Sequence, residues 1–278
     1  MVVLYLFSRK TIFSLLAMVM LSSYVRPTRS IATGKSKNIP NHPSKGTTMI
    51  FPGGGIFFYW QAGVVTYLRE AGYDLSDVTF VGASAGALVA TFTATDVDFE
   101  EATDLALSMC DDYGVWERPL GLFGVWGEIV ELWLDKLLHE DSLELATDRL
   151  CILLTSIPSF EKQKISFFHD KRDLISANMA SVHLPWFMNF SPCASFRKKV
   201  FIDGSFFSTI EDYREDTSTA CITINWQDDP KMVSMSGDFA KAIGREKIWS
   251  IFEDGKEFAE CVEGTGKFRQ LGKAIRCT

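Results

Sequence analysis

The feature that most constrains this chain is the run Gly82-Ala83-Ser84-Ala85-Gly86, which directly follows the apolar residues 78–81. A short apolar run bounded by glycine is typical of a buried strand, and the small residues after it favour the start of a helix. The run matches G-x-S-x-G, in which a strand turns sharply into a helix and leaves the serine hydroxyl exposed. Ser84 is therefore a candidate nucleophile. The competing interpretation is a serine that merely occupies a tight turn.

A second glycine-rich turn, Pro52-Gly53-Gly54-Gly55, lies between a strand predicted at 47–51 and a helix predicted at 57–69. Strand, loop, helix, strand, turn and helix in this order predict an α/β fold with a mainly parallel sheet. Such a loop exposes backbone N–H groups, which can bind a nucleotide phosphate or the oxyanion of acyl transfer. The glycines lack the full dinucleotide fingerprint, and Ser84 stands where a ribose-binding acid is expected. The sequence therefore predicts no bound nucleotide.

Ser84 also needs a general base, and the positions of the histidines give little support for a histidine in that role. In α/β-hydrolases the histidine comes late in the chain, whereas the last 95 residues here contain none. His169 and His183 stay open as alternatives, although a lone histidine is usually structural. Asp203 ends a short apolar strand predicted at 199–202, and Gly204 allows close backbone approach. A carboxylate within hydrogen-bond reach can act as the base itself, although Asp-Gly is also an ordinary turn dipeptide.

Taken together, the glycine loop, the G-x-S-x-G run and the Asp-Gly dipeptide resemble the patatin-like phospholipase family, over about residues 47–210. The resemblance implies a three-layer α/β/α sandwich with a mainly parallel central sheet. It also implies hydrolysis of fatty acyl esters of phospholipids or neutral lipids through an acyl-enzyme, with neither metal nor organic cofactor. The implied site consists of the nucleophile Ser84, its base Asp203, the oxyanion-hole residues Gly53, Gly54 and Gly55, and the supporting Gly82, Gly86 and Gly204.

The chain departs from the family pattern at several positions. Phe57 and Phe58 stand where the family's loop usually continues to another glycine, and Ser205 follows Asp-Gly where glycine or alanine is usual. Ser208 and Ile210 occupy the places of a later Asn and Pro. These departures motivate the alternative hypothesis, a lipid-binding protein with the same fold that is catalytically weak or inactive.

The charge is distributed very unevenly along the chain. The formal net charge is −7, yet residues 1–48 hold seven basic side chains and no acid, so the remainder carries −14. A short apolar stretch at 12–21 follows Arg9-Lys10, which is the pattern of a targeting signal. We expect residues 1–46 to be an N-terminal targeting or anchor segment with a linker, directed to the endomembrane system or to an organelle such as a plastid. Residues 47–278 are expected to form a single hydrolase domain.

Composition also bears on the partners. An acidic body argues against nucleic-acid binding, which needs a basic face to displace counterions. The expected partner is a lipid substrate at a membrane or droplet surface, while the sequence leaves the oligomeric state open. The segment 116–138 is rich in Trp and Leu, and it is interpreted either as a lid or bilayer-docking helix or as a helix packed on the core.

Overall fold

The computed structural model describes residues 46–214, 220–238 and 241–273. The targeting segment predicted for residues 1–46 lies outside the described residues, apart from Gly46. Among the helices that are described, none is long and apolar enough to cross a membrane.

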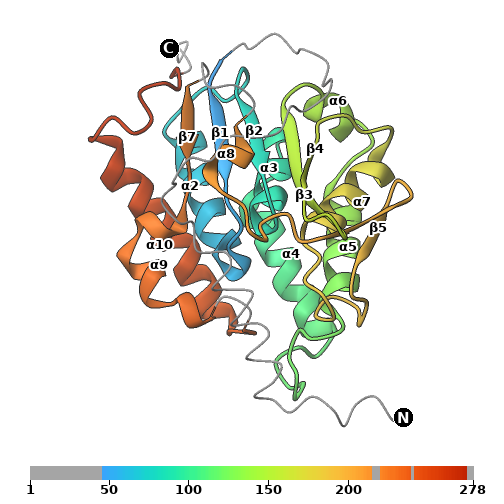
Figure 1. Cartoon of the computed structure of the whole chain (residues 1–278). Helices are drawn as coiled ribbons and strands as arrows, with labels where there is room; N and C mark the ends of the chain where they lie inside the picture. Colours follow the sequence, from blue (N-terminus) through green and yellow to red (C-terminus); the bar gives the residue numbers. More distant parts are fainter. Residues whose placement is uncertain (1–45, 215–219, 239–240, 274–278) are drawn as a thin grey trace, which may run out of the picture.

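One sheet organises the described part of the chain (Figure 1). In sequence order its strands are β1 (Thr48–Phe51), β2 (Thr79–Gly82), β3 (Leu150–Ser156), β4 (Lys162–Ile165), β5 (Ala194–Phe196), β6 (Lys199–Ile202) and β7 (Cys221–Thr223). Strands β7, β1, β2 and β3 pair in parallel, whereas β4 and β6 are antiparallel to β3, and β5 is antiparallel to β6. The central strands β1 and β3 are fully buried, as expected for parallel strands covered on both faces.

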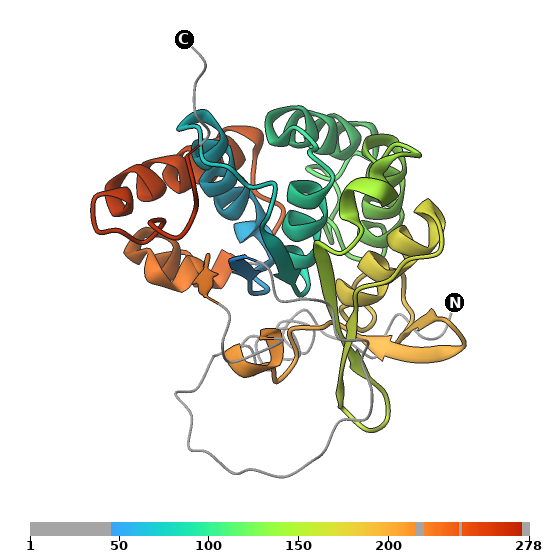
Figure 2. The same ribbon diagram turned by 90° about the horizontal axis from the view of Figure 1, so that it is seen from above.

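Helices cover the two faces of the sheet unequally. Figure 2 shows α2, α3, α4 and α10 on one side of the strands and the short α8 on the other. The larger apolar core lies on the first side, and a smaller cluster with Ile50, Val81 and Tyr213 packs on the second. The helices are α2 (Phe58–Glu70), α3 (Ala85–Ala94), α4 (Phe99–Asp112), α5 (Trp126–Leu137), α6 (Ser142–Ala146), α7 (Lys171–Ser181), α8 (Ile210–Tyr213), α9 (Pro230–Ser234) and α10 (Arg245–Glu263).

The strand registers bring two distant segments together. Strand β2 runs parallel to β3 and its last residue pairs with Ile152, while β6 runs antiparallel to β3 and its last residue pairs with Thr155. Both strands lie on the edge of β3 opposite β4, since β4 also pairs with Ile152 and Thr155. The two strands therefore run toward each other along β3. The residues that follow them, Ser84 and Asp203, meet where they converge.

The predicted fold class is confirmed: the described residues form a mixed α/β fold with a mainly parallel central sheet flanked by helices. The segment 116–138 contains α5, whose inner face packs on the core through Ile129, Trp133 and Leu134. The structure adds one short strand, β5, that the sequence did not indicate. Its hairpin partner β6 lies where it was expected.

Candidate functional site

Ser84 occupies a strained turn between β2 and α3. Its backbone has φ 55° and ψ −132°, a conformation that residues with a side chain rarely adopt. A Cβ atom on Gly82 would lie 2.1 Å from the carbonyl oxygen of Gly86, and one on Gly86 would lie 2.0 Å from that of Phe51. Only glycine fits at either flank. The turn thus holds Ser84 at the end of β2, with its side chain pointing out of the sheet and its main chain fixed.

The Ser84 hydroxyl donates a hydrogen bond to Oδ2 of Asp203 at 2.6 Å. Asp203 is completely buried, and its other oxygen, Oδ1, accepts hydrogen bonds from the backbone N–H and the hydroxyl of Ser205 at 2.8 and 2.6 Å. Burial raises the pKa of the Asp203 carboxyl, while the hydrogen bonds from Ser205 and Ser84 and the charge of Lys162 act to lower it. A buried carboxylate with three donors is a suitable base for a serine hydroxyl.

Ser181, the last residue of α7, ties the two halves of this arrangement together. Its hydroxyl donates to the carbonyl of Leu153 at 2.8 Å and accepts from the backbone N–H of Ser84 at 3.0 Å. A Cβ atom on Gly204 would lie only 1.8 Å from the same Leu153 carbonyl oxygen. The close approach of Gly204 and the clamp by Ser181 fix the separation of Ser84 and Asp203 through one point on β3.

Lys162 lies near Asp203, and no sequence pattern singled it out. Its ammonium group donates to Thr155 Oγ1 at 2.8 Å and to the backbone carbonyls of Gly204 and Phe206. Burial lowers the pKa of Lys162 to about 8, opposed by the charges of Asp212 and Asp203. Lys162 therefore holds the loop after Asp203 and places positive charge near the buried carboxylate.

The first glycine loop lies directly beside the two serines. A Cβ atom on Gly53 would be 2.7 Å from Cβ of Ser205 and 3.0 Å from Cβ of Ser84, so only glycine fits. The indole of Trp226 supports the loop from outside, because its Nε1 donates to the Gly53 carbonyl at 3.2 Å. Gly55 has φ +55°, a left-handed conformation that favours glycine.

The N–H groups of this loop differ in their surroundings. Burial raises the pKa of Tyr213, opposed by hydrogen bonds that its oxygen makes with Ser208 and with the backbone of Gly53. The backbone N–H of Gly53 therefore lies close to the Tyr213 oxygen. Within the described ranges, no acceptor is paired with the N–H of Gly54. Gly54 is free to donate to a guest, and Gly55 lines the pocket beside Ser84.

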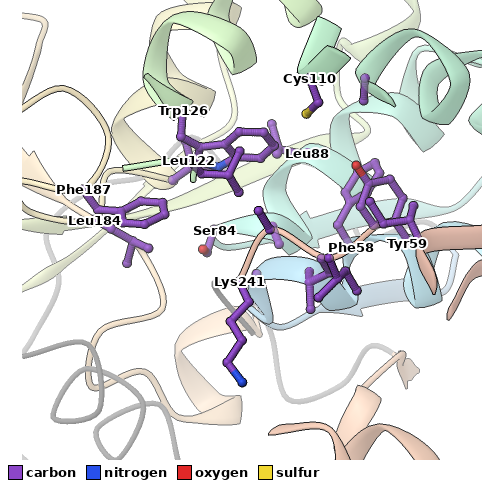
Figure 3. Close-up of a pocket in the computed structure, with 18 of the residues that line it drawn as sticks. Phe58, Tyr59, Ser84, Leu88, Cys110, Leu122, Trp126, Leu184, Phe187 and Lys241 are labelled. Carbon is purple, nitrogen blue, oxygen red and sulfur yellow. The ribbon is translucent and has the colours of Figure 1, made fainter. Parts of the chain in front are cut away.

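An apolar pocket of about 100 Å³ opens on the other side of Ser84. Figure 3 shows Ser84 at its floor, with Leu122 and Trp126 above, Leu184 and Phe187 to one side, and Phe58 and Tyr59 to the other. Cys110 also lines it, and burial raises the pKa of this thiol to about 11, so that it stays neutral. A pocket with so few polar groups suits a hydrocarbon chain better than a polar head group.

Among the described residues, neither alternative histidine hydrogen-bonds through its ring to Ser84 or to the carboxyl of Asp203. The ring of His183 hydrogen-bonds to the carbonyl of Ser191 at 3.1 Å, and its own carbonyl accepts from the backbone N–H of Asp203. The ring of His169 packs edge-on against Phe167. The structure thus brings together Ser84, Asp203 and the glycine loop, as the sequence predicted. Ser181, Lys162, Trp226 and Tyr213 were missed, because each is linked to the site only through tertiary contacts.

Comparison with known proteins assigns the family. The model of the patatin-like phospholipase family matches residues 49–211, which is more than half of the chain. The chain belongs to the patatin-like phospholipase family. The matched residues include the glycine loop, the Ser84 turn and the strand that ends at Asp203.

Relatives of the patatin-like domain point in the same direction. The chain is 29% identical over 169 residues to the omega-hydroxyceramide transacylase of Mus musculus, covering 60% of this chain and 28% of the relative. It is 33% identical over 168 residues to patatin-like phospholipase domain-containing protein 2 of Homo sapiens, covering 59% and 33%. The chain thus spans about a third of the length of the curated relatives it matches. Among solved structures, VipD from Legionella pneumophila matches with a TM-score of 0.46 and 11% identity, over 89% of this chain and 73% of that one.

Proposed function

We propose that the chain is a lipid acyl hydrolase that works through a Ser-Asp dyad. Asp203 takes the proton of the Ser84 hydroxyl as the Ser84 oxygen attacks the carbonyl carbon of a fatty acyl ester. The same proton passes from Asp203 to the departing alkoxide, and an acyl-enzyme remains on Ser84. Water then attacks the acyl carbon, gives a proton to Asp203, and releases the fatty acid as Ser84 regains its hydroxyl. The observation that carries this proposal is the 2.6 Å hydrogen bond between Ser84 and the buried Asp203.

The glycine loop supplies the oxyanion hole in this proposal. The N–H of Gly54 has no acceptor among the described residues, and the adjacent Gly55 lines the pocket beside Ser84. Each donor to the oxyanion is worth on the order of 3 kcal/mol. The Gly53 N–H, close to the Tyr213 oxygen, is the third proposed donor. Ser84 also lies at the N-terminus of α3, whose dipole favours negative charge at that point.

The pocket supports an apolar acyl chain as the group transferred. Esters of phospholipids or neutral lipids are the proposed substrates, met at a membrane or droplet surface, to which the N-terminal segment would direct the protein. Phe58, one of the departures from the family pattern, is a wall of this pocket. Ser205, another of these departures, donates twice to Asp203. Both residues therefore fit an active site, which favours the enzyme over an inactive lipid-binding protein.

A second function, acyl transfer to a lipid hydroxyl, is favoured by one observation. Relatives in mouse and human are named omega-hydroxyceramide transacylases. The chemistry needs the same acyl-enzyme, with an alcohol in place of water in the second step. The two functions differ in the acceptor that reaches Ser84.

The experiment is an assay of the purified full-length chain against phosphatidylcholine, a galactolipid and triacylglycerol, with and without an added long-chain alcohol. We expect release of free fatty acid from one of these classes by the wild type and by Ser176→Ala, a control on α7 away from the site. Ser84→Ala should release none. Fatty acid release that Ser84→Ala retains would contradict the proposal, and transfer to the alcohol in place of release would select the second function.

A further inference from the structure

Two large aromatic side chains stand in solvent on the loop after α7. Trp186 is 48% exposed and Phe190 is 61% exposed. Both have left-handed backbones, with φ of 62° and 60°, a conformation that bulky residues rarely adopt. The Phe190 ring packs edge-on against Phe123, with 5.4 Å between the ring centroids, yet most of its surface stays exposed. Residues held in such conformations tend to lie at functional sites.

The loop is firmly held, so these rings have fixed positions. The backbone N–H of Trp186 donates to the carbonyl of Ser191 at 2.8 Å and closes the loop. The N–H groups of Gly124 and Gly127, at the start of α5, donate to the carbonyls of Phe187 and Met188 at 2.7 and 3.0 Å. The loop and the start of α5 therefore form one rigid surface with exposed rings.

This surface is continuous with the pocket beside Ser84. Leu184, Phe187 and Met188 belong to the same loop as Trp186 and Phe190, and all three line that pocket. Figure 3 labels Leu184 and Phe187 there. Side chains of one short loop thus alternate between the pocket wall and solvent. Any apolar phase that the exposed rings enter would be brought to the pocket.

The charge of the surface differs from that of the rest of the molecule. Residues 49–278 carry a formal charge of −14, yet residues 174–202 and 118–127 contain no Asp or Glu. Acidic side chains near an anionic bilayer would be repelled, and they would lose hydration on contact with any lipid surface. These two segments lack that obstacle, and the first acid of α5 is Glu128, which is exposed in its first turn.

We infer that the aromatic loop 184–191, with the start of α5, docks the protein on a phospholipid surface and presents the pocket to it. Trp and Phe are the side chains that best enter the interface between head groups and acyl chains. What happens after docking rests on the proposed function, whereas docking itself does not. A lipid surface is favoured over a protein partner because the surface adjoins an apolar pocket and the segments 118–127 and 174–202 contain no acid.

The test compares full-length wild type, the double variant Trp186→Ser/Phe190→Ser, and Phe167→Ser. Phe167 is a matched control: it is 64% exposed and follows β4, which pairs with the side of β3 opposite β2. Two quantities are measured for each: binding to vesicles of phosphatidylcholine with one fifth phosphatidylglycerol, and the rate on vesicle lipid divided by the rate on p-nitrophenyl butyrate. We expect the double variant to lose at least tenfold in one or both, with unchanged hydrolysis of the soluble ester. Phe167→Ser should match the wild type.

Three outcomes would overturn the inference. The double variant equals the wild type in both quantities, or Phe167→Ser loses as much as the double variant, or only self-association on size-exclusion chromatography changes, which would make the surface an interface between copies. Failure of the proposed function looks different. No variant would then hydrolyse the soluble ester, and vesicle binding would still report on docking.

Discussion

The two sides of Ser84 are built from opposite kinds of residue. On one side its hydroxyl donates to Asp203, whose other oxygen accepts from Ser205. The charge of Lys162 also acts on Asp203, so both carboxylate oxygens are held by polar groups. On the other side Ser84 faces Leu88, Trp126 and Phe187 across an apolar pocket. The polar side can move a proton and the apolar side can hold a chain. An ester carbonyl between them places its reactive carbon at Ser84 and its hydrocarbon tail away from the charges.

The two sides of Ser84 also differ in the elements that form them. The polar side is assembled at β3, where β2 and β6 converge and where glycine allows backbone contact. The apolar side is lined mainly by side chains of helices α2, α3, α4 and α5 and of the loop after α7. Changes on the polar side should therefore abolish chemistry or folding, and changes on the apolar side should alter substrate choice.

The largest effect is expected when the base is removed and the shape of its side chain is kept. Asp203→Asn keeps the size of the side chain but cannot accept the Ser84 proton as a carboxylate does. We expect kcat to fall by about 10³- to 10⁴-fold, as when other serine hydrolases lose the acid or base of their site. Circular dichroism should show an unchanged fold. A variant that keeps more than a tenth of the wild-type rate would mean that Asp203 is not the base.

The backbone contact at β3 provides the next test. Gly204→Ala puts a Cβ atom 1.8 Å from the Leu153 carbonyl oxygen, so the backbone must move. We expect a loss of about 3 kcal/mol in the free energy of unfolding, measured by urea denaturation. The control is Gly264→Ala at the end of α10, where nothing lies within 4 Å of the added atom. Equal stabilities for the two variants would show that Gly204 is not under this constraint.

On the apolar side, Trp126→Ala should change selectivity and leave the chemistry intact. Removal of the indole enlarges the pocket, so the kcat/KM ratio for palmitoyl over butyryl ester should rise about tenfold, the scale expected for a few methylenes in an apolar site. Trp249→Ala on α10, outside the pocket lining, should leave the ratio unchanged. If Trp126→Ala instead lowers kcat/KM equally for both esters, the pocket does not select the acyl chain.

The smallest expected effect separates positioning from chemistry on the polar side. Ser205→Ala removes the hydroxyl that donates to Asp203 Oδ1, although the backbone N–H of residue 205 still donates. That hydroxyl lowers the pKa of Asp203, so without it the carboxyl keeps its proton to higher pH. Since the base must be deprotonated, the acidic limb of the kcat–pH profile should move to higher pH. The rate well above that limb should fall only a few-fold. An unmoved limb would contradict this role.

A site residue could be predicted from the sequence where its neighbours in the chain form a recognisable pattern. The Ser84 turn, the glycine loop and the strand before Asp203 each carry glycines or apolar residues next to the functional one, and the structure brings them together as predicted. Lys162 and Tyr213 carry no such signal, because a lysine in a strand or a tyrosine in a short helix is ordinary until the fold places it beside Asp203. Their roles depend on how β4 and α8 pack.

The Trp- and Leu-rich segment 116–138 shows a second limit. Its composition was compatible with a lid, a docking helix or the core, and the structure uses it for both the core and the pocket wall. One stretch serves two surfaces because successive helical side chains point in different directions. The most exposed rings near the site came from elsewhere, at Trp186 and Phe190. Composition therefore indicated where apolar residues are frequent, but not which of them are exposed to solvent.

The central claim, that Ser84 is a nucleophile activated by Asp203, is tested most directly by covalent labelling. The full-length chain is treated with a fluorophosphonate, digested, and sequenced by mass spectrometry. We expect one adduct per chain, on Ser84. Ser84→Ala should form no adduct, and Asp203→Asn should form it far more slowly. An adduct on another serine, or labelling of Ser84→Ala to the same extent as the wild type, would contradict it.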